Sequence, residues 1–84
     1  MRSILYLTYK IIIINMNLMK KYIHSKWTSI KKLNGWKHYE VKTVFVKAKE
    51  LEIFSVCDQS IIERISINEI ENRDVWIPGW QELD

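Results

Sequence analysis

Lysines and aromatic residues are interspersed in the stretch that follows residue 25. The side chains that this stretch offers to a ligand are Lys26, Lys31, Lys32, Trp36, Lys37 and Tyr39. Ammonium groups attract phosphates and aromatic rings stack on unpaired bases, so proteins that bind single-stranded nucleic acid combine the two. A solvated hairpin has a similar composition, and none of these cations is an arginine, the residue that makes bidentate phosphate contacts. The pattern predicts a binding surface for RNA or another acidic partner, with a plain solvated hairpin as the alternative.

Few other side chains have the chemistry for catalysis or metal binding. His24, His38 and Cys57 are scattered and lack the close pairs that structural zinc sites show. His38 and Glu40 would share one face of a strand, where a surface contact is the expected role and acid-base catalysis the minor alternative. Cys57 has no predicted basic neighbour to activate it, so a buried thiol is expected. We therefore expect no enzyme activity, no metal site and no cofactor.

The charge of the chain is divided unequally between its two halves. Thirteen Lys and Arg residues stand against ten Asp and Glu residues, a net charge of +3. Up to Lys49 there are eleven bases and one acid (11 − 1 = +10), and from Glu50 onward two bases and nine acids (2 − 9 = −7). A basic half of this kind attracts nucleic acid or anionic lipid. The alternative is that the two halves lie against each other and neutralise their charges.

The length of the chain and its single cysteine limit the architecture. A chain of 84 residues has room for one domain. Four Trp, four Tyr and two Phe would supply a small core with a few large side chains. One cysteine forms no internal disulfide, which favours a reducing compartment.

Residues 1–24 are expected to form an apolar N-terminal extension, attached loosely to the rest. The apolar run 4–19 is shorter than the roughly 20 residues of a spanning helix and is interrupted by a lysine and two asparagines, so no membrane span is predicted. Its β-branched centre, residues 11–14, fits a strand as well as a helix. Three roles remain open: a dispensable extension with translation starting at Met16 or Met19, a helix that docks on a membrane or partner, or part of the core.

Residues 25–84 are expected to form a mainly β, tryptophan-rich domain. The predicted strands are residues 26–30, 36–48, 51–57 and 61–67. Asn34-Gly35 is a strong signal for a tight hairpin turn. The second strand becomes apolar on both faces near its end, which predicts a bulge near Thr43 or entry into a closed sheet. The expected fold is a small bent antiparallel sheet or an SH3-like barrel.

The C-terminal segment is expected to close this domain. Ser66 or Asn68 would cap a short helical turn, and Asp74 would cap a second turn that presents Trp76. We predict that a structural clasp covers the sheet, with Trp27 and Trp76 in the core and Trp36 and Trp80 partly exposed. The clasp residues are Trp27, Trp76, Pro78, Gly79 and Trp80.

Four sequence blocks carry a resemblance to a known family. They are Ser25-Lys26-Trp27-Thr28-Ser29, then residues 35–41, then Leu51-Glu52 with Val56-Cys57-Asp58, and finally residues 74–80. In this order they resemble the small tryptophan-rich family of conserved hypothetical proteins of cyanobacteria, other bacteria and algal plastids. The chain departs from that family at Ser66-Ile67, where a Pro-Trp pair is frequent, and in the first twenty or so residues.

The resemblance implies a photosynthetic lineage and no known activity. The location it implies is the chloroplast stroma, the stromal membrane surface or a bacterial cytoplasm. Together with the charge pattern, it leads us to expect a small non-enzymatic protein that binds an acidic partner such as RNA or a ribonucleoprotein. The alternative is an accessory or assembly protein of a photosynthetic, thylakoid membrane complex. The ligand and the oligomeric state are left open by the sequence.

Overall fold

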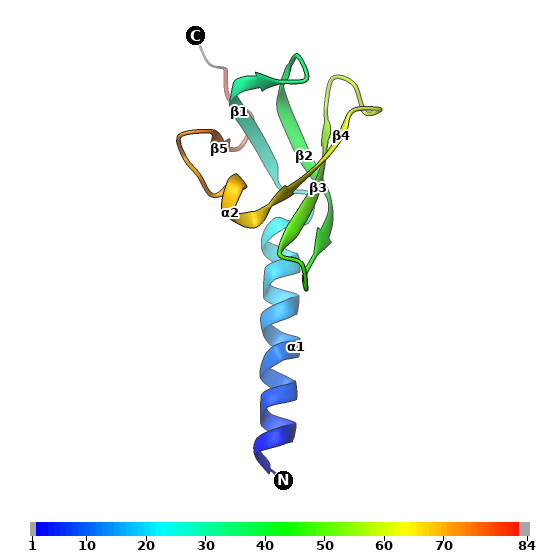
Figure 1. Cartoon of the computed structure of the whole chain (residues 1–84), viewed down its shortest axis with the longest axis vertical. Helices are drawn as coiled ribbons and strands as arrows, with labels where there is room; N and C mark the ends of the chain where they lie inside the picture. The colour runs from blue at the N-terminus through cyan, green and yellow to red at the C-terminus, as the bar shows by residue number, and fades with distance from the viewer. Residues whose placement is uncertain (1, 83–84) are drawn as a thin grey trace.

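The described part of the chain forms five strands and two helices in a computed structural model (Figure 1). The structure describes residues 2–82, with the backbone alone for residues 2–9 and 11. The elements in chain order are α1 (Arg2–Tyr22), β1 (Lys26–Leu33), β2 (Trp36–Phe45), β3 (Glu50–Ser55), β4 (Ile62–Ser66), α2 (Ile67–Ile70) and β5 (Trp76–Pro78).

The strands form one antiparallel sheet in the order β4-β3-β2-β1-β5. The predicted mainly β fold with a short C-terminal helical turn is therefore confirmed. Of the two architectures that the sequence left open, the bent sheet is formed. The SH3-like barrel is not, because β4 and β5 occupy opposite edges of the sheet and do not pair.

Two local irregularities shape the central strands as the sequence predicted. Asn34 and Gly35 have φ angles of 52° and 85°, the positive values that a tight hairpin turn requires. The register between β2 and β3 shifts between Val41 and Thr43, so the predicted bulge is confirmed. Because of the bulge, Val41 and Val44 are both buried although they are three residues apart.

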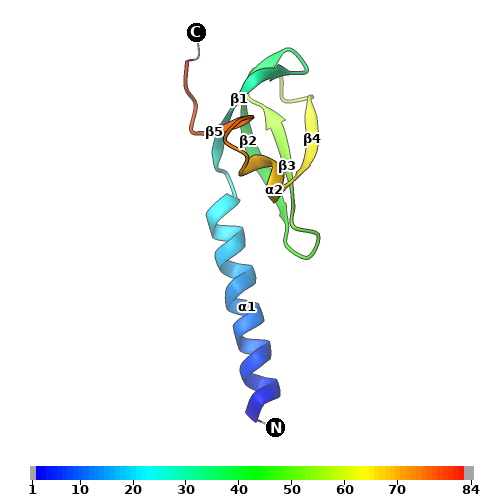
Figure 2. The same cartoon turned by 60° about the vertical axis from the view of Figure 1, so that its left-hand side comes forward.

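The core lies on one face of the sheet and is covered by α2 and by Trp76 of β5. Tyr39, Leu51 and Ile53 are fully buried on the strands. Ile70 of α2 is also fully buried, and α2 lies over the sheet in Figure 2. The Ser66 hydroxyl accepts a hydrogen bond from the backbone N–H of Glu69 at 3.0 Å, which confirms the first of the two predicted caps.

The second predicted turn is formed just before Trp76, but Asp74 does not cap it. Asn72, not Asp74, organises this turn: its side chain accepts from the Asp74 N–H at 3.0 Å, and its carbonyl accepts from the Trp76 N–H at 2.9 Å. Trp76 then pairs with Ser29 of β1. The predicted cap was two residues too late, and the pairing of residues 76–78 with the edge of β1 was not predicted, because a local cap signal does not reveal it.

The clasp is bound to the sheet through main-chain groups. The buried Thr28 hydroxyl donates to the Gly79 carbonyl at 2.7 Å and accepts from the Gln81 N–H at 2.9 Å. The Trp80 indole N–H donates to the Tyr39 carbonyl at 3.0 Å. Gly79 adopts a φ of 81°, which a residue with a side chain rarely adopts. The predicted clasp is thus a fifth strand followed by a hydrogen-bonded tail.

Helix α1 contacts the domain only near its C-terminal end and otherwise extends away from it (Figure 1). Tyr22 is buried in the core, and Leu18 and Ile23 pack against it. The apolar run is therefore helical, not a strand, and its last turn is an integral piece of the core. Among the described residues, no helix is long and apolar enough to cross a membrane.

The phenol of Tyr22 links this last turn of α1 to the acidic half of the chain. Its hydroxyl donates to Glu71 Oε1 at 2.9 Å. Burial, followed by this hydrogen bond to a carboxylate, raises the pKa of Tyr22 from 10.0 to about 12. Since the unfolded chain releases this proton first, we expect the contribution of Tyr22 to the free energy of unfolding to be complete below pH 10 and lost between about pH 10 and 12.

The measurement is an alkaline absorbance titration of the protein and of Tyr22→Phe. The difference between the two curves isolates the ionisation of Tyr22, whose midpoint should lie at about pH 12. A difference curve centred near the ordinary tyrosine value would show that the phenol is neither buried nor bonded to Glu71.

Candidate functional site

The predicted binding surface centres on a large bulge in β1. Thr28 pairs with His38, but the next pair in the register is Leu33 with Trp36. Four residues of β1, 29–32, therefore stand opposite the single residue Lys37 of β2. The three extra residues of β1 do not pair regularly with β2 and form a basic loop at one end of the hairpin. Lys31 and Lys32 are exposed on this loop.

Hydrogen bonds hold the base of this bulge. The buried Ser29 hydroxyl donates to the Lys31 carbonyl, which closes the loop on itself. The Ile30 N–H donates to the Val75 carbonyl at 2.8 Å, just before β5 begins. The fifth strand therefore positions the basic loop as well as covering the core.

The adjoining turn is fixed from two sides. The Asn34 side-chain amide donates to Glu63 Oε1 of β4 at 2.6 Å, and the Tyr39 hydroxyl donates to the Leu33 carbonyl at 2.5 Å. Trp36 follows the turn and keeps 38% of its surface exposed, as the sequence predicted. An exposed aromatic residue thus follows the same turn that the two lysines precede.

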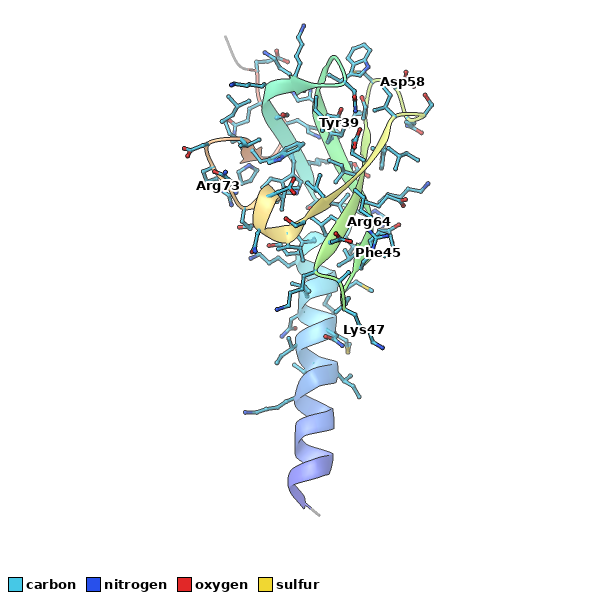
Figure 3. All side chains as sticks on the ribbon, viewed as in Figure 1. Tyr39, Phe45, Lys47, Asp58, Arg64 and Arg73 are labelled. Carbon is cyan, nitrogen blue, oxygen red and sulfur yellow. The ribbon has the colours of Figure 1, made fainter. Side chains whose placement is uncertain are left out.

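Tyr39 does not belong to this surface, and its predicted place in a binding site is wrong. It is fully buried, and its ring meets that of Trp76 edge-on at a centroid distance of 5.8 Å. Burial raises the pKa of the Tyr39 phenol. In Figure 3 the side chain lies inside the β domain. Strand alternation correctly predicted that Tyr39 and Val41 share a face of β2. In the bent sheet this face is the one that packs in the core.

Lys26 lies at the other end of the hairpin, so the predicted site is divided. It pairs with Glu40 on β2, five residues along β1 from Lys31. Its ammonium group lies 4.8 Å from the ring centroid of Trp80, which is 42% exposed. Lys31, Lys32, Trp36 and Lys37 all lie near the turn of the β1–β2 hairpin, whereas Lys26 contacts the clasp through a cation–π interaction with Trp80.

A depression of about 380 Å³ lies between the bulge, β4 and β5. Its apolar lining comes from Leu33, Ile65, Val75 and Trp76, and its charged lining from Lys31, Lys32, Glu63, Arg64 and Glu69. Three cations and two carboxylates in this lining leave it with a small net positive charge.

The potential metal ligands and nucleophiles stay apart. Among residues 2–82, no three His, Cys, Asp or Glu side chains are grouped as a metal site would need. His38 Nε2 lies 2.9 Å from the Gln81 carbonyl, and because a carbonyl only accepts, this nitrogen carries the proton. Cys57 is exposed, so the expected buried thiol was wrong: β3 ends at Ser55 and Cys57 falls in the following bend.

Two of the four indoles lie in the core and two at the surface. Trp27 and Trp76 are 5% and 3% exposed, and the Trp27 N–H donates to the Ser25 hydroxyl at 2.8 Å. The Arg73 guanidinium lies over the Trp27 ring, with 5.3 Å between its carbon and the ring centroid. The sequence predicted this division of the tryptophans, but not the role of Arg73.

Comparison with known proteins identifies the β domain. The sequence profile described as "Tryptophan-rich protein (DUF2389)" matches residues 25–81, and α1 lies outside the match. No curated protein and no solved structure matches the chain. The matched segment holds all four tryptophans and all five strands. The chain belongs to the tryptophan-rich protein family DUF2389.

Proposed function

We propose that this protein binds single-stranded RNA, without catalysis, through the tip of the β1–β2 hairpin. The observation that carries the proposal is the bulge in β1, which exposes Lys31 and Lys32 at the same end of the hairpin as the 38% exposed Trp36. Two ammonium groups supply electrostatic attraction to phosphates, and one ring supplies a stacking platform for an unpaired base. The turn geometry that presents them is preformed, which lowers the entropic cost of binding.

The charge layout supports a polyanion as the partner. The ion pairs Arg64–Glu50 (2.7 Å) and Arg73–Glu71 (3.2 Å) both join residues of the acidic half of the chain. Lys31 and Lys32 form no ion pair with a described residue. Glu63 and Glu69 of the acidic half line the same depression as these two lysines but form no ion pair with them.

The salt dependence of RNA affinity tests this proposal. Two phosphate contacts to a single strand predict a log–log slope of about −1.4, so the affinity should fall about sevenfold when salt rises from about 50 to about 200 mM. The measurement is fluorescence anisotropy of a labelled uridine-rich oligonucleotide titrated with the full chain. An affinity that ignores salt would exclude phosphate contacts. No RNA affinity at low salt would direct the search to acidic proteins.

The second function that the sequence allowed, an accessory protein of a photosynthetic membrane complex, stays a prediction. The observation that favours a partner of this kind is the apolar surface of α1, where Ile14 is 61% exposed. Affinity purification of the tagged protein with and without nuclease treatment separates the two functions. RNA-mediated partners are lost on nuclease treatment, whereas thylakoid subunits would be retained.

A further inference from the structure

Helix α1 carries an exposed apolar strip that the proposed RNA site does not use. Ile12, Met16 and Met19 are 51%, 51% and 45% exposed. At 3.6 residues per turn these three positions fall within about 60° of one another around the helix axis. Leu18, which packs on the domain, lies about 100° or more from all three around the helix axis, and Tyr22 borders the strip on that side. The strip therefore keeps about half of its surface exposed, and Met16 and Met19 face the end of the β2–β3 hairpin across a depression.

The β domain continues this strip across the end of the β2–β3 hairpin. A depression of about 530 Å³ lies between the two, and most of its lining is apolar. The lining residues are Asn15, Met16 and Met19 from α1, and Phe45, Val46, Lys47, Ala48 and Arg64 from the domain. Elements far apart in the sequence thus contribute to one apolar surface, larger than α1 would provide alone.

Cations flank this surface and carboxylates are nearly absent from it. Residues 2–22 contain two basic residues in the last turn of α1, Lys20 and Lys21, and no Asp or Glu at all. Lys47 is exposed beside the depression (Figure 3). Glu50 forms an ion pair with Arg64. The guanidinium carbon of Arg64 lies 3.8 Å from the ring centroid of Phe45.

We propose that α1 and the end of the β2–β3 hairpin bind together to the surface of an anionic membrane. The helix would lie in the plane of the interface, with the apolar strip of Ile12, Met16 and Met19 buried at the level of the acyl chains and the lysines at the headgroups. Apolar side chains with flanking cations are the features that interfacial helices use.

Charge complementarity favours a lipid surface over a second copy of the chain. A helix pair formed by two copies would bring together helices that carry lysines and no carboxylate. Like charges at such a seam are destabilising. An anionic headgroup layer satisfies the same cations and covers the helix and the hairpin at once.

The test is co-sedimentation of the full chain with phosphatidylcholine vesicles, with and without about 30 % phosphatidylglycerol. We expect binding to the anionic vesicles to be at least about tenfold tighter than to the neutral ones. Ile12→Gln/Met16→Gln should weaken it at least about tenfold, because two exposed apolar side chains leave the interface while the charge is unchanged. Both positions are half-exposed, so the circular dichroism melting curve should not move.

Lys31→Glu/Lys32→Glu is the matched control for the RNA site. It should lose RNA affinity and retain most of its vesicle binding, so the two proposals fail independently. Equal binding to neutral and anionic vesicles, or full binding by Ile12→Gln/Met16→Gln, would overturn the membrane proposal. A dimer that Ile12→Gln/Met16→Gln disrupts, without vesicle binding, would assign the surface to a second copy instead.

Discussion

Replacement of Trp76 with alanine is expected to lower the free energy of unfolding by about 3–5 kcal/mol. The ring is 3% exposed and meets the fully buried Tyr39 edge-on. Its backbone also pairs β5 with Ser29 of β1, at the base of the basic bulge. A domain of this size has a total stability of roughly 5–10 kcal/mol, so a loss of this size removes much of the folded population.

The matched control is Trp36→Ala, which removes the same side chain from the surface. Trp36 is 38% exposed, and we expect its replacement to cost less than about 1.5 kcal/mol. Urea denaturation followed by circular dichroism measures both variants. A Trp76→Ala midpoint equal to that of the unchanged protein would show that Trp76 lies outside the core.

Features encoded by neighbouring residues were predictable from the sequence. Asn34-Gly35 specifies its turn because both residues tolerate a positive φ. The bulge after Val41 follows from a strand whose apolar residues change face. The Ser66 cap follows from a hydroxyl followed by an acidic first turn. In each case the signal and the structure that it produces lie within a few residues.

Features that depend on distant pairing were not predictable in the same way. Trp76 joins a strand because β1 offers an edge, and β1 lies almost fifty residues earlier. Tyr39 is buried because β5 and α2 cover its face of the sheet. Alternation shows that Tyr39 and Val41 share a face, but not which face the rest of the chain covers.

The candidate site was predictable in composition but not in extent. The sequence identified Lys31, Lys32, Trp36 and Lys37, which the hairpin places together. The predicted site also included Lys26, which lies at the other end of the hairpin, and Tyr39, which lies on its buried face. Proximity in sequence does not distinguish the ends or the faces of a hairpin. The large bulge at residues 29–32, which exposes the lysines, had no local signal such as a glycine within it.

Reversal of two charges on the bulge is expected to abolish most of the RNA affinity. Lys31→Glu/Lys32→Glu removes two phosphate contacts and places two carboxylates against the backbone of the RNA. The affinity at low salt should fall by about tenfold or more, and the salt slope should approach zero. Both side chains are exposed and form no ion pair with a described residue, so the stability of the domain should change little.

Lys42→Glu/Lys47→Glu is the control with the same change in net charge. These two lysines are exposed on β2 and at the end of the β2–β3 hairpin, away from the bulge. Anisotropy titrations of both variants and the unchanged protein, in one low-salt buffer, separate a local contact from a general effect of charge. We predict a large loss for Lys31→Glu/Lys32→Glu and a much smaller one for the control. Equal losses in the two variants would contradict a binding site on the β1–β2 hairpin.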